Sequence, residues 1–191
     1  ASYDGYQQFL DSHSANDMVW YKNVDSQFTG NEDIVEVTEH IFHTIHLFGV
    51  RGAISGSLES LNWDSEKSGF KETELWIAMK EAIDNGVYGV NDYGNGDPTN
   101  PDLAGVMMKE YMYLLNFNMW SYGSTFWEGG TLAPEWNDNS RTPQGILNNN
   151  PLGYSLFNTY FSPVLSKPSV ESLRRIFQDN DGGESGYKSD D

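Results

Sequence analysis

Apolar residues recur at helical spacing in three long segments of this chain, and they predict helices over residues 34–48, 71–85 and 101–120. Asp33 is positioned to cap the first helix, and Gly49 is positioned to end it. The apolar residues of the first segment are Ile34, Val37, Ile41, Ile45 and Phe48. The dominant period is therefore that of the α-helix, and it predicts a mainly α fold.

Three shorter helices are expected at 143–149, 151–161 and 169–178, because each begins with a capping residue and a proline. Long loops rich in Gly, Asn and Asp separate the predicted helices. The chain is expected to form a single helical domain over residues 1–178, followed by an acidic Gly/Asp-rich tail over residues 179–191.

The segment 101–120 differs from the other predicted helices because it is apolar on nearly all sides. Its apolar residues are Leu103, Val106, Met107, Met108, Tyr111, Met112, Leu114, Leu115, Phe117 and Met119. A helix without a polar face is buried on all sides, so this helix is expected at the centre of the domain.

The composition narrows the chemistry that the chain can perform. The 191 residues carry a formal net charge of −17 and no cysteine, which excludes disulfides, thiolate zinc sites and thiol catalysis. The negative charge repels nucleic acids and anionic lipids, and no apolar stretch approaches the roughly 18 residues of a membrane helix. The composition is typical of a secreted bacterial protein, with a cytoplasmic acidic protein as the alternative.

The first predicted helix carries a cluster of metal-binding residue types. At about 100° per residue, Glu36, Glu39, His40, His43 and His46 fall within one sector of roughly 120°, opposite the apolar residues. This face has no Lys or Arg, which is unusual for a face that only confers solubility. Imidazoles and carboxylates in this pattern match the ligand preference of zinc or a similar cation.

Glu110 is a second candidate ligand, because it lies on an apolar side of the helix predicted over 101–120. A buried carboxylate is costly unless it is paired or bound to a metal. Lys109 is adjacent in sequence but points about 100° away, so it is not expected to be the partner. If the two helices pack together, Glu110 can join the histidines of the first helix in one site.

These residues also have structural interpretations. Glu36 follows Asp33 by three residues, as in a capping box. His43 or His46 can be a core histidine that is hydrogen-bonded to a carbonyl group.

The segment Glu36-Val37-Thr38-Glu39-His40 resembles the HxxEH motif of the inverzincin metallopeptidases, with Glu36 in place of the first ligand histidine. The resemblance implies Glu39 as general base, and His40 and the distant Glu110 as metal ligands. From Glu39 to His43 the chain is also similar to the HExxH helix of the zincins, with its first two residues exchanged. His43 can replace the missing histidine because it shares a stripe with His40.

Two loops leave alternatives open. The segment Asn91–Asp102 has the oxygen-bearing side chains of a calcium loop without a recognised spacing, and a solvated turn is the alternative. The loop Gly123–Trp136 either lines a substrate cleft or is packed by its own side chains, Trp127 and Trp136 among them.

Together these features support the hypothesis of a secreted metal-dependent hydrolase, peptidase-like, that acts on a peptide or another small substrate. The expected cofactor is a transition metal, zinc first, with calcium as a further possibility. The expected ligands are Glu36, His40, His43 and Glu110, and Glu39 is the expected general base. The first alternative is a non-enzymatic metal- or calcium-binding module of an extracellular structural or adhesive protein, and the second is a purely structural helical domain.

Overall fold

The structure, a computed structural model, describes residues 31–50, 60–127 and 135–176, and it is mainly helical, as the sequence predicts. Within these residues the β-structure is limited to an isolated antiparallel bridge between Tyr88 and Trp136. In the part of the chain that is described, no helix combines the length and apolarity needed to cross a bilayer. The predicted tail over 179–191 lies outside the described residues.

The contacts of the chain divide it into two units. The smaller unit contains residues 1–44 and 168–191, and in it helix α2 (Asn31–Thr44) packs against helix α9 (Val170–Ile176). The larger unit spans residues 45–167. The single domain that the sequence suggests stays a prediction.

Helix α2 begins earlier than the sequence indicates. Because it begins at Asn31, Asp33 lies inside the helix and not at the N-cap position expected for it. After Thr44 the chain continues as a π-helix over Ile45–Val50. A π-helical turn shifts the side chains that follow it around the helix, because it contains more residues per turn than an α-helix.

The buried residues of this segment match the expected apolar side only in part. Ile41, an expected apolar contact, is 44% exposed, whereas Ile34 and Phe42 are buried. His43 and His46 are each only 2% exposed. Two of the histidines assigned to the polar face are therefore interior residues.

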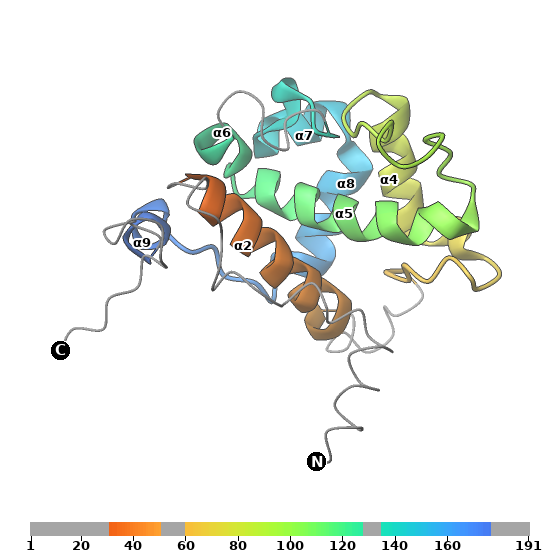
Figure 1. Ribbon diagram of the computed structural model, residues 1–191, viewed down its shortest axis with the longest axis horizontal. Coiled ribbons are helices and arrows are strands. Elements are labelled where there is room, and N and C mark those ends of the chain that lie inside the picture. Colours follow the sequence, from red (N-terminus) through yellow and green to blue (C-terminus); the bar gives the residue numbers. More distant parts are fainter. Residues whose placement is uncertain (1–30, 51–59, 128–134, 177–191) are drawn as a thin grey trace, which may run out of the picture. The chain divides into compact units, whose positions relative to one another are not determined.

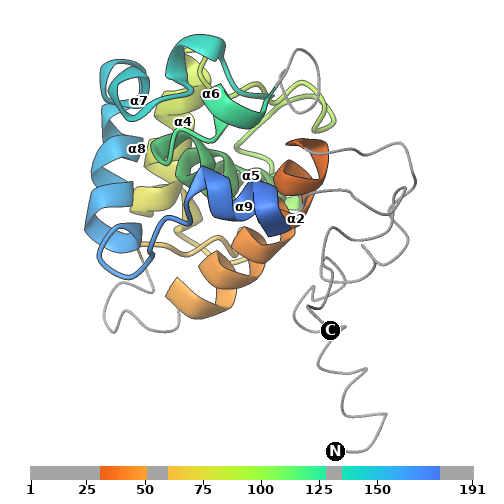
Figure 2. The same cartoon turned by 90° about the vertical axis from the view of Figure 1, so that its left-hand side faces the viewer.

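The larger unit is built around helix α5 (Pro101–Met119), which contacts α4, α6, α7 and a second π-helix. Figure 1 shows α5 crossing α8 and its π-helical continuation, and Figure 2 shows α7 and α8 side by side. The other elements are α4 (Glu74–Asp84), α6 (Gly123–Phe126), α7 (Pro143–Asn149), α8 (Pro151–Leu156), the π-helix Phe157–Phe161, and the 3₁₀ turns Phe70–Glu72 and Asp138–Ser140.

Helix α5 lies at the centre of the larger unit, as its apolar composition predicts. Every residue from Tyr111 to Met119 is buried. The helix begins as the sequence indicates, because the Asn100 side chain accepts a hydrogen bond from the Asp102 amide at 3.0 Å and Pro101 occupies the first turn. Burial of this apolar helix supplies much of the hydrophobic stabilisation of the unit.

The two tryptophans of the loop Gly123–Trp136 lie in the core. Trp136 is fully buried, and its indole Nε1 donates to the Ser140 carbonyl at 2.8 Å. Trp127 is 5% exposed and stacks on Phe117 with ring centroids 5.2 Å apart. These tryptophans therefore pack the interior and do not line a cleft.

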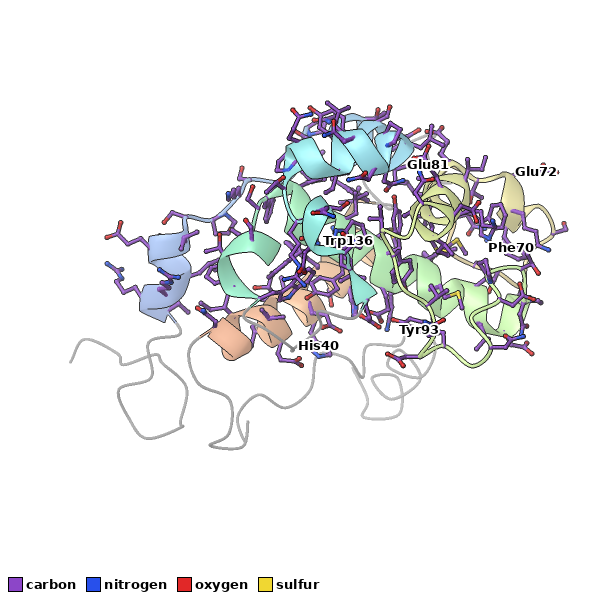
Figure 3. All side chains as sticks on the ribbon, turned by 90° about the horizontal axis from the view of Figure 1, so that it is seen from above. His40, Phe70, Glu72, Glu81, Tyr93 and Trp136 are labelled. Carbon is purple, nitrogen blue, oxygen red and sulfur yellow. The ribbon has the colours of Figure 1, made fainter. Side chains whose placement is uncertain are left out.

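Asn150 links three helices inside the larger unit. Its Nδ2 donates to the Ala78 carbonyl at 3.0 Å and to Glu81 of α4 at 2.8 Å, and its Oδ1 accepts from the Tyr111 hydroxyl of α5 at 2.7 Å. Glu81, labelled in Figure 3, also accepts from the Leu152 amide at the start of α8.

Replacing Asn150 with Ala should lower the free energy of unfolding by about 2–4 kcal/mol, because the substitution leaves buried polar groups of its partners unsatisfied. Urea denaturation followed by circular dichroism measures this change. The exposed Asn148 on α7 is the control, and Asn148→Ala should change stability by about 0.5 kcal/mol or less. Equal effects of the two substitutions would contradict the proposed role of Asn150.

Candidate metal centre

Helix α2 carries four of the candidate site residues, namely Glu36, Glu39, His40 and His43. Glu39 and His43 are four residues apart, so their side chains lie on one face, one turn from each other. Glu36 and His43 are seven residues apart, which separates their Cα atoms by about 10 Å along the helix. A single ion therefore fits Glu39 with His43 more readily than Glu36 with His43.

The two histidines of α2 differ in exposure. His43 is buried, whereas His40 is partly exposed, and their ring centroids lie 5.8 Å apart in an edge-to-face arrangement. The Thr44 hydroxyl donates to the backbone carbonyl of His40 at 3.3 Å. Of the two, His43 is the imidazole that is shielded from water.

His46 belongs to the larger unit and has a different environment. Its Nε2 lies 3.1 Å from Oδ1 of Asn116, which is fully buried in α5. Its ring stacks on Phe161 with centroids 4.7 Å apart and an interplanar angle of 29°. His46 therefore matches the core-histidine interpretation, with a side-chain amide as its partner where a carbonyl was expected.

Glu110 lies on α5 with its side chain 14% exposed, close to the burial that the sequence predicts. The expectation about Lys109 is wrong, because Lys109 Nζ lies 3.3 Å from Glu110 Oε1. The four-carbon stem of lysine is long and flexible enough to bridge the 100° between adjacent helical positions. Glu110 thus has a cationic neighbour of its own in the larger unit.

Sequence reasoning missed a second carboxylate near Glu110. Glu135 accepts a hydrogen bond from the Tyr93 hydroxyl at 2.7 Å. Burial raises the pKa of Glu135 above its usual value, the Tyr93 hydrogen bond lowers it, and the nearby carboxylates Glu110 and Asp92 raise it further. The sequence shows Glu135 only as one residue of a loop, because its proximity to Glu110 depends on tertiary contacts.

The backbone holds Glu135 in place. Its carbonyl accepts from the Gly89 amide at 2.8 Å, next to the bridge that joins Tyr88 and Trp136. The Tyr88 hydroxyl in turn donates to the Met107 carbonyl of α5 at 3.3 Å, one turn before Glu110. This chain of contacts brings the Glu135 segment alongside the part of α5 that carries Glu110.

Tyr93 acts as a hydrogen-bond donor to Glu135. Burial, as the largest cause, raises the pKa of Tyr93, and the Glu135 and Glu110 carboxylates raise it further, whereas a hydrogen bond with Tyr88 lowers it. Tyr93 is therefore protonated near neutral pH, and its hydroxyl proton is available to Glu135. Figure 3 labels Tyr93 in this part of the larger unit.

The oxygen-rich loop Asn91–Asp102 uses its side chains locally. Asn95 accepts from the Asp97 amide, and Asp97 accepts from the amide and hydroxyl of Thr99. The two hydrogen bonds from Thr99 lower the pKa of Asp97. Such contacts are typical of ordinary Asx turns, in keeping with a solvated turn. Calcium binding stays a prediction.

Glu39, His43 and Glu110 each offer one ligand atom of a kind that binds a divalent cation. The roles predicted for Glu36 and His40 as ligands, and for Glu39 as base, stay predictions. No protein-family model matches the sequence, and no curated protein or solved structure matches it significantly. The function must therefore be inferred from the residues of the site themselves.

Proposed function

We propose that the protein is a metal-dependent hydrolase in which Glu39 and His43 of α2 bind one transition-metal ion. The observation that carries this proposal is the combination of ligand types on α2: a shielded imidazole and a carboxylate one helical turn apart, in a chain that has no cysteine. This ligand set differs from the sequence-based one, because Glu39 becomes a ligand where it was expected to be the base. His43 and Glu39 fit one ion because they are separated by a single helical turn.

An ion that the protein holds through Glu39 and His43 of α2 keeps coordination positions for water or substrate, which favours catalysis over a purely structural role for the metal. Catalytic zinc sites commonly keep three protein ligands and one position for water or substrate, whereas structural sites are closed by four. A bound divalent ion lowers the pKa of water toward neutrality and polarises a carbonyl oxygen. We propose amide bonds of peptides as substrates, which agrees with the resemblance of the segment from Glu36 to His43 to metallopeptidase helices.

The first test is the metal content of the natively purified protein, measured by inductively coupled plasma mass spectrometry. The proposal expects about one zinc, manganese, iron or cobalt ion per chain, and cleavage within a peptide library when that metal is present. Absence of metal, together with no gain of binding after adding zinc or manganese, would refute the proposal.

A non-enzymatic metal-binding module is the second candidate function. It is favoured by the acidic character of the chain, whose net charge of −17 makes divalent cations effective counterions. Stoichiometric metal without cleavage of any library peptide would support this module. Cleavage that stops when the metal is removed would support the hydrolase.

A further inference from the structure

Arg141 is an interior residue of the larger unit and lies just before α7. It is 9% exposed, whereas the other Lys and Arg residues that the structure describes are exposed or partly exposed. An arginine side chain stays positively charged in a protein, and a buried charge is costly unless hydrogen-bond acceptors surround it. The guanidinium group of Arg141 therefore needs partners with negative charge.

One such partner is Asp138, three residues earlier in the chain. Nη2 of Arg141 lies 2.7 Å from Oδ1 of Asp138, but the side chain of Asp138 is 84% exposed. Water screens the charge of an exposed carboxylate, so this ion pair neutralises the buried guanidinium group only in part. Positive charge therefore remains at Arg141 in the interior.

Two buried N–H groups beside each other have no hydrogen-bond acceptor among the residues that the structure describes. They are Nε of Arg141 and the indole Nε1 of Trp127. The two side chains are neighbours, because the guanidinium carbon of Arg141 lies 5.0 Å from the ring centroid of Trp127. Buried donors without an acceptor are rare in folded proteins, and a bound ion or water molecule often accounts for them.

The surrounding elements hold both side chains in place. Trp127 stacks on Phe117 of α5, with ring centroids 5.2 Å apart. The backbone amide of Arg141 donates to the carbonyl of Asp138 at 3.4 Å, and the next residue, Thr142, caps α7. Donors that are already ordered bind a ligand more tightly, because little conformational entropy is lost on binding.

We propose that Arg141 and Trp127 form a binding site for a small anion with a single negative charge, either chloride or the carboxylate of a small organic acid. This anion accepts hydrogen bonds from Nε of Arg141 and Nε1 of Trp127, and it completes the neutralisation of the guanidinium group. A second negative charge is disfavoured by Asp138 and by the net charge of −17. The site does not depend on the proposed metal-dependent activity.

The experiment measures anion binding to the full chain at constant ionic strength, which is maintained with sodium sulfate. Metal is first removed with a chelating resin, because chloride also binds zinc ions. Chloride binding is followed by the broadening of the chloride NMR line, and formate binding by saturation-transfer difference NMR. The wild-type protein should give a saturable signal with at least one of the two anions.

Three variants assign the signal to the site. Arg141→Lys keeps the charge but removes the Nε donor, and it should lower anion affinity by about tenfold or more. Trp127→Phe keeps an aromatic ring and removes the indole N–H, and it should lower affinity by about 2–10-fold. Lys167→Met is the matched control, because exposed Lys167 also lies over an aromatic ring, 5.2 Å from the ring centroid of Tyr122. Its affinity should equal that of the wild type.

Circular dichroism checks the folding of each variant, and Trp127→Phe decides the question if Arg141→Lys does not fold. A chloride signal alone identifies a halide site, and a formate signal alone identifies a carboxylate site. Formate that narrows the chloride line shows that both anions share the site. Absence of a saturable signal with either anion would overturn the proposal. Wild-type affinity in Arg141→Lys and Trp127→Phe, or an equal loss in Lys167→Met, would overturn it as well.

Discussion

His43→Ala is expected to weaken binding of the transition metal by about 100-fold or more, because it removes the only imidazole of the proposed ligand set. Substitutions in the surroundings of a metal site already cost about 10–100-fold in affinity, and loss of a ligand should cost at least as much. His43 is also shielded from solvent, because its exposed fraction is only 2%. Bulk water therefore cannot easily take the place of its ring nitrogen as a metal ligand in the variant. Isothermal titration calorimetry with zinc or manganese measures the change.

His46 provides the matched control, because it is another histidine with an exposed fraction of 2% and lies three residues further along the chain. Its contacts are to Asn116 and Phe161, so His46→Gln should lower stability and leave metal affinity unchanged. Equal metal affinity of His43→Ala and wild type would exclude His43 as a ligand. Equal loss in the two variants would indicate that unfolding, and not ligand removal, releases the metal.

Removing the metal with a chelator is expected to lower the melting temperature by about 5–11 °C. A ligand that binds only the folded state contributes about 2.7 kcal/mol when its free concentration is a hundred times Kd. For a chain of about 150–250 residues, 1 kcal/mol corresponds to roughly 2–4 °C in melting temperature. Differential scanning calorimetry of the metal-loaded and chelated protein measures this shift.

A comparison of zinc or manganese with sodium chloride separates specific metal binding from charge screening, and it is the control for the chelator experiment. The net charge of −17 makes the chain repel itself, so any added cation relieves some repulsion. Zinc or manganese should stabilise the protein at micromolar concentration, whereas sodium chloride should need far higher concentrations. A melting temperature that depends on ionic strength alone would contradict specific binding.

The helices could be predicted from the sequence because the signals that form them are local. Pro143 and Pro151 mark the first residues of α7 and α8, and Asn100 caps α5 as its position indicates. A run of apolar residues on all sides correctly placed α5 at the centre of its unit. Each of these signals acts over one or two helical turns, so no tertiary information was needed.

The candidate site was predicted less completely, because side-chain environments depend on contacts between distant segments. The sequence indicated Glu36, His40, His43 and Glu110 as metal ligands and Glu39 as the general base, since residue types and helical spacing can be read directly. It placed His43 on the polar face, whereas the structure buries this residue. It did not predict the ion pair of Glu110 with Lys109, which depends on the conformation of a long side chain.

The sequence by itself determined the helical architecture, the absence of thiol chemistry and the residue types available for a metal site, because composition and period express local preferences and residue chemistry. Tertiary structure decided which of these residues are interior. It turned His46 toward Asn116 in the core, and it brought Glu135 near Glu110 through a bridge between segments about fifty residues apart in sequence. The physical reason is that burial and pKa shifts depend on which surfaces pack together, and packing is a property of the whole fold.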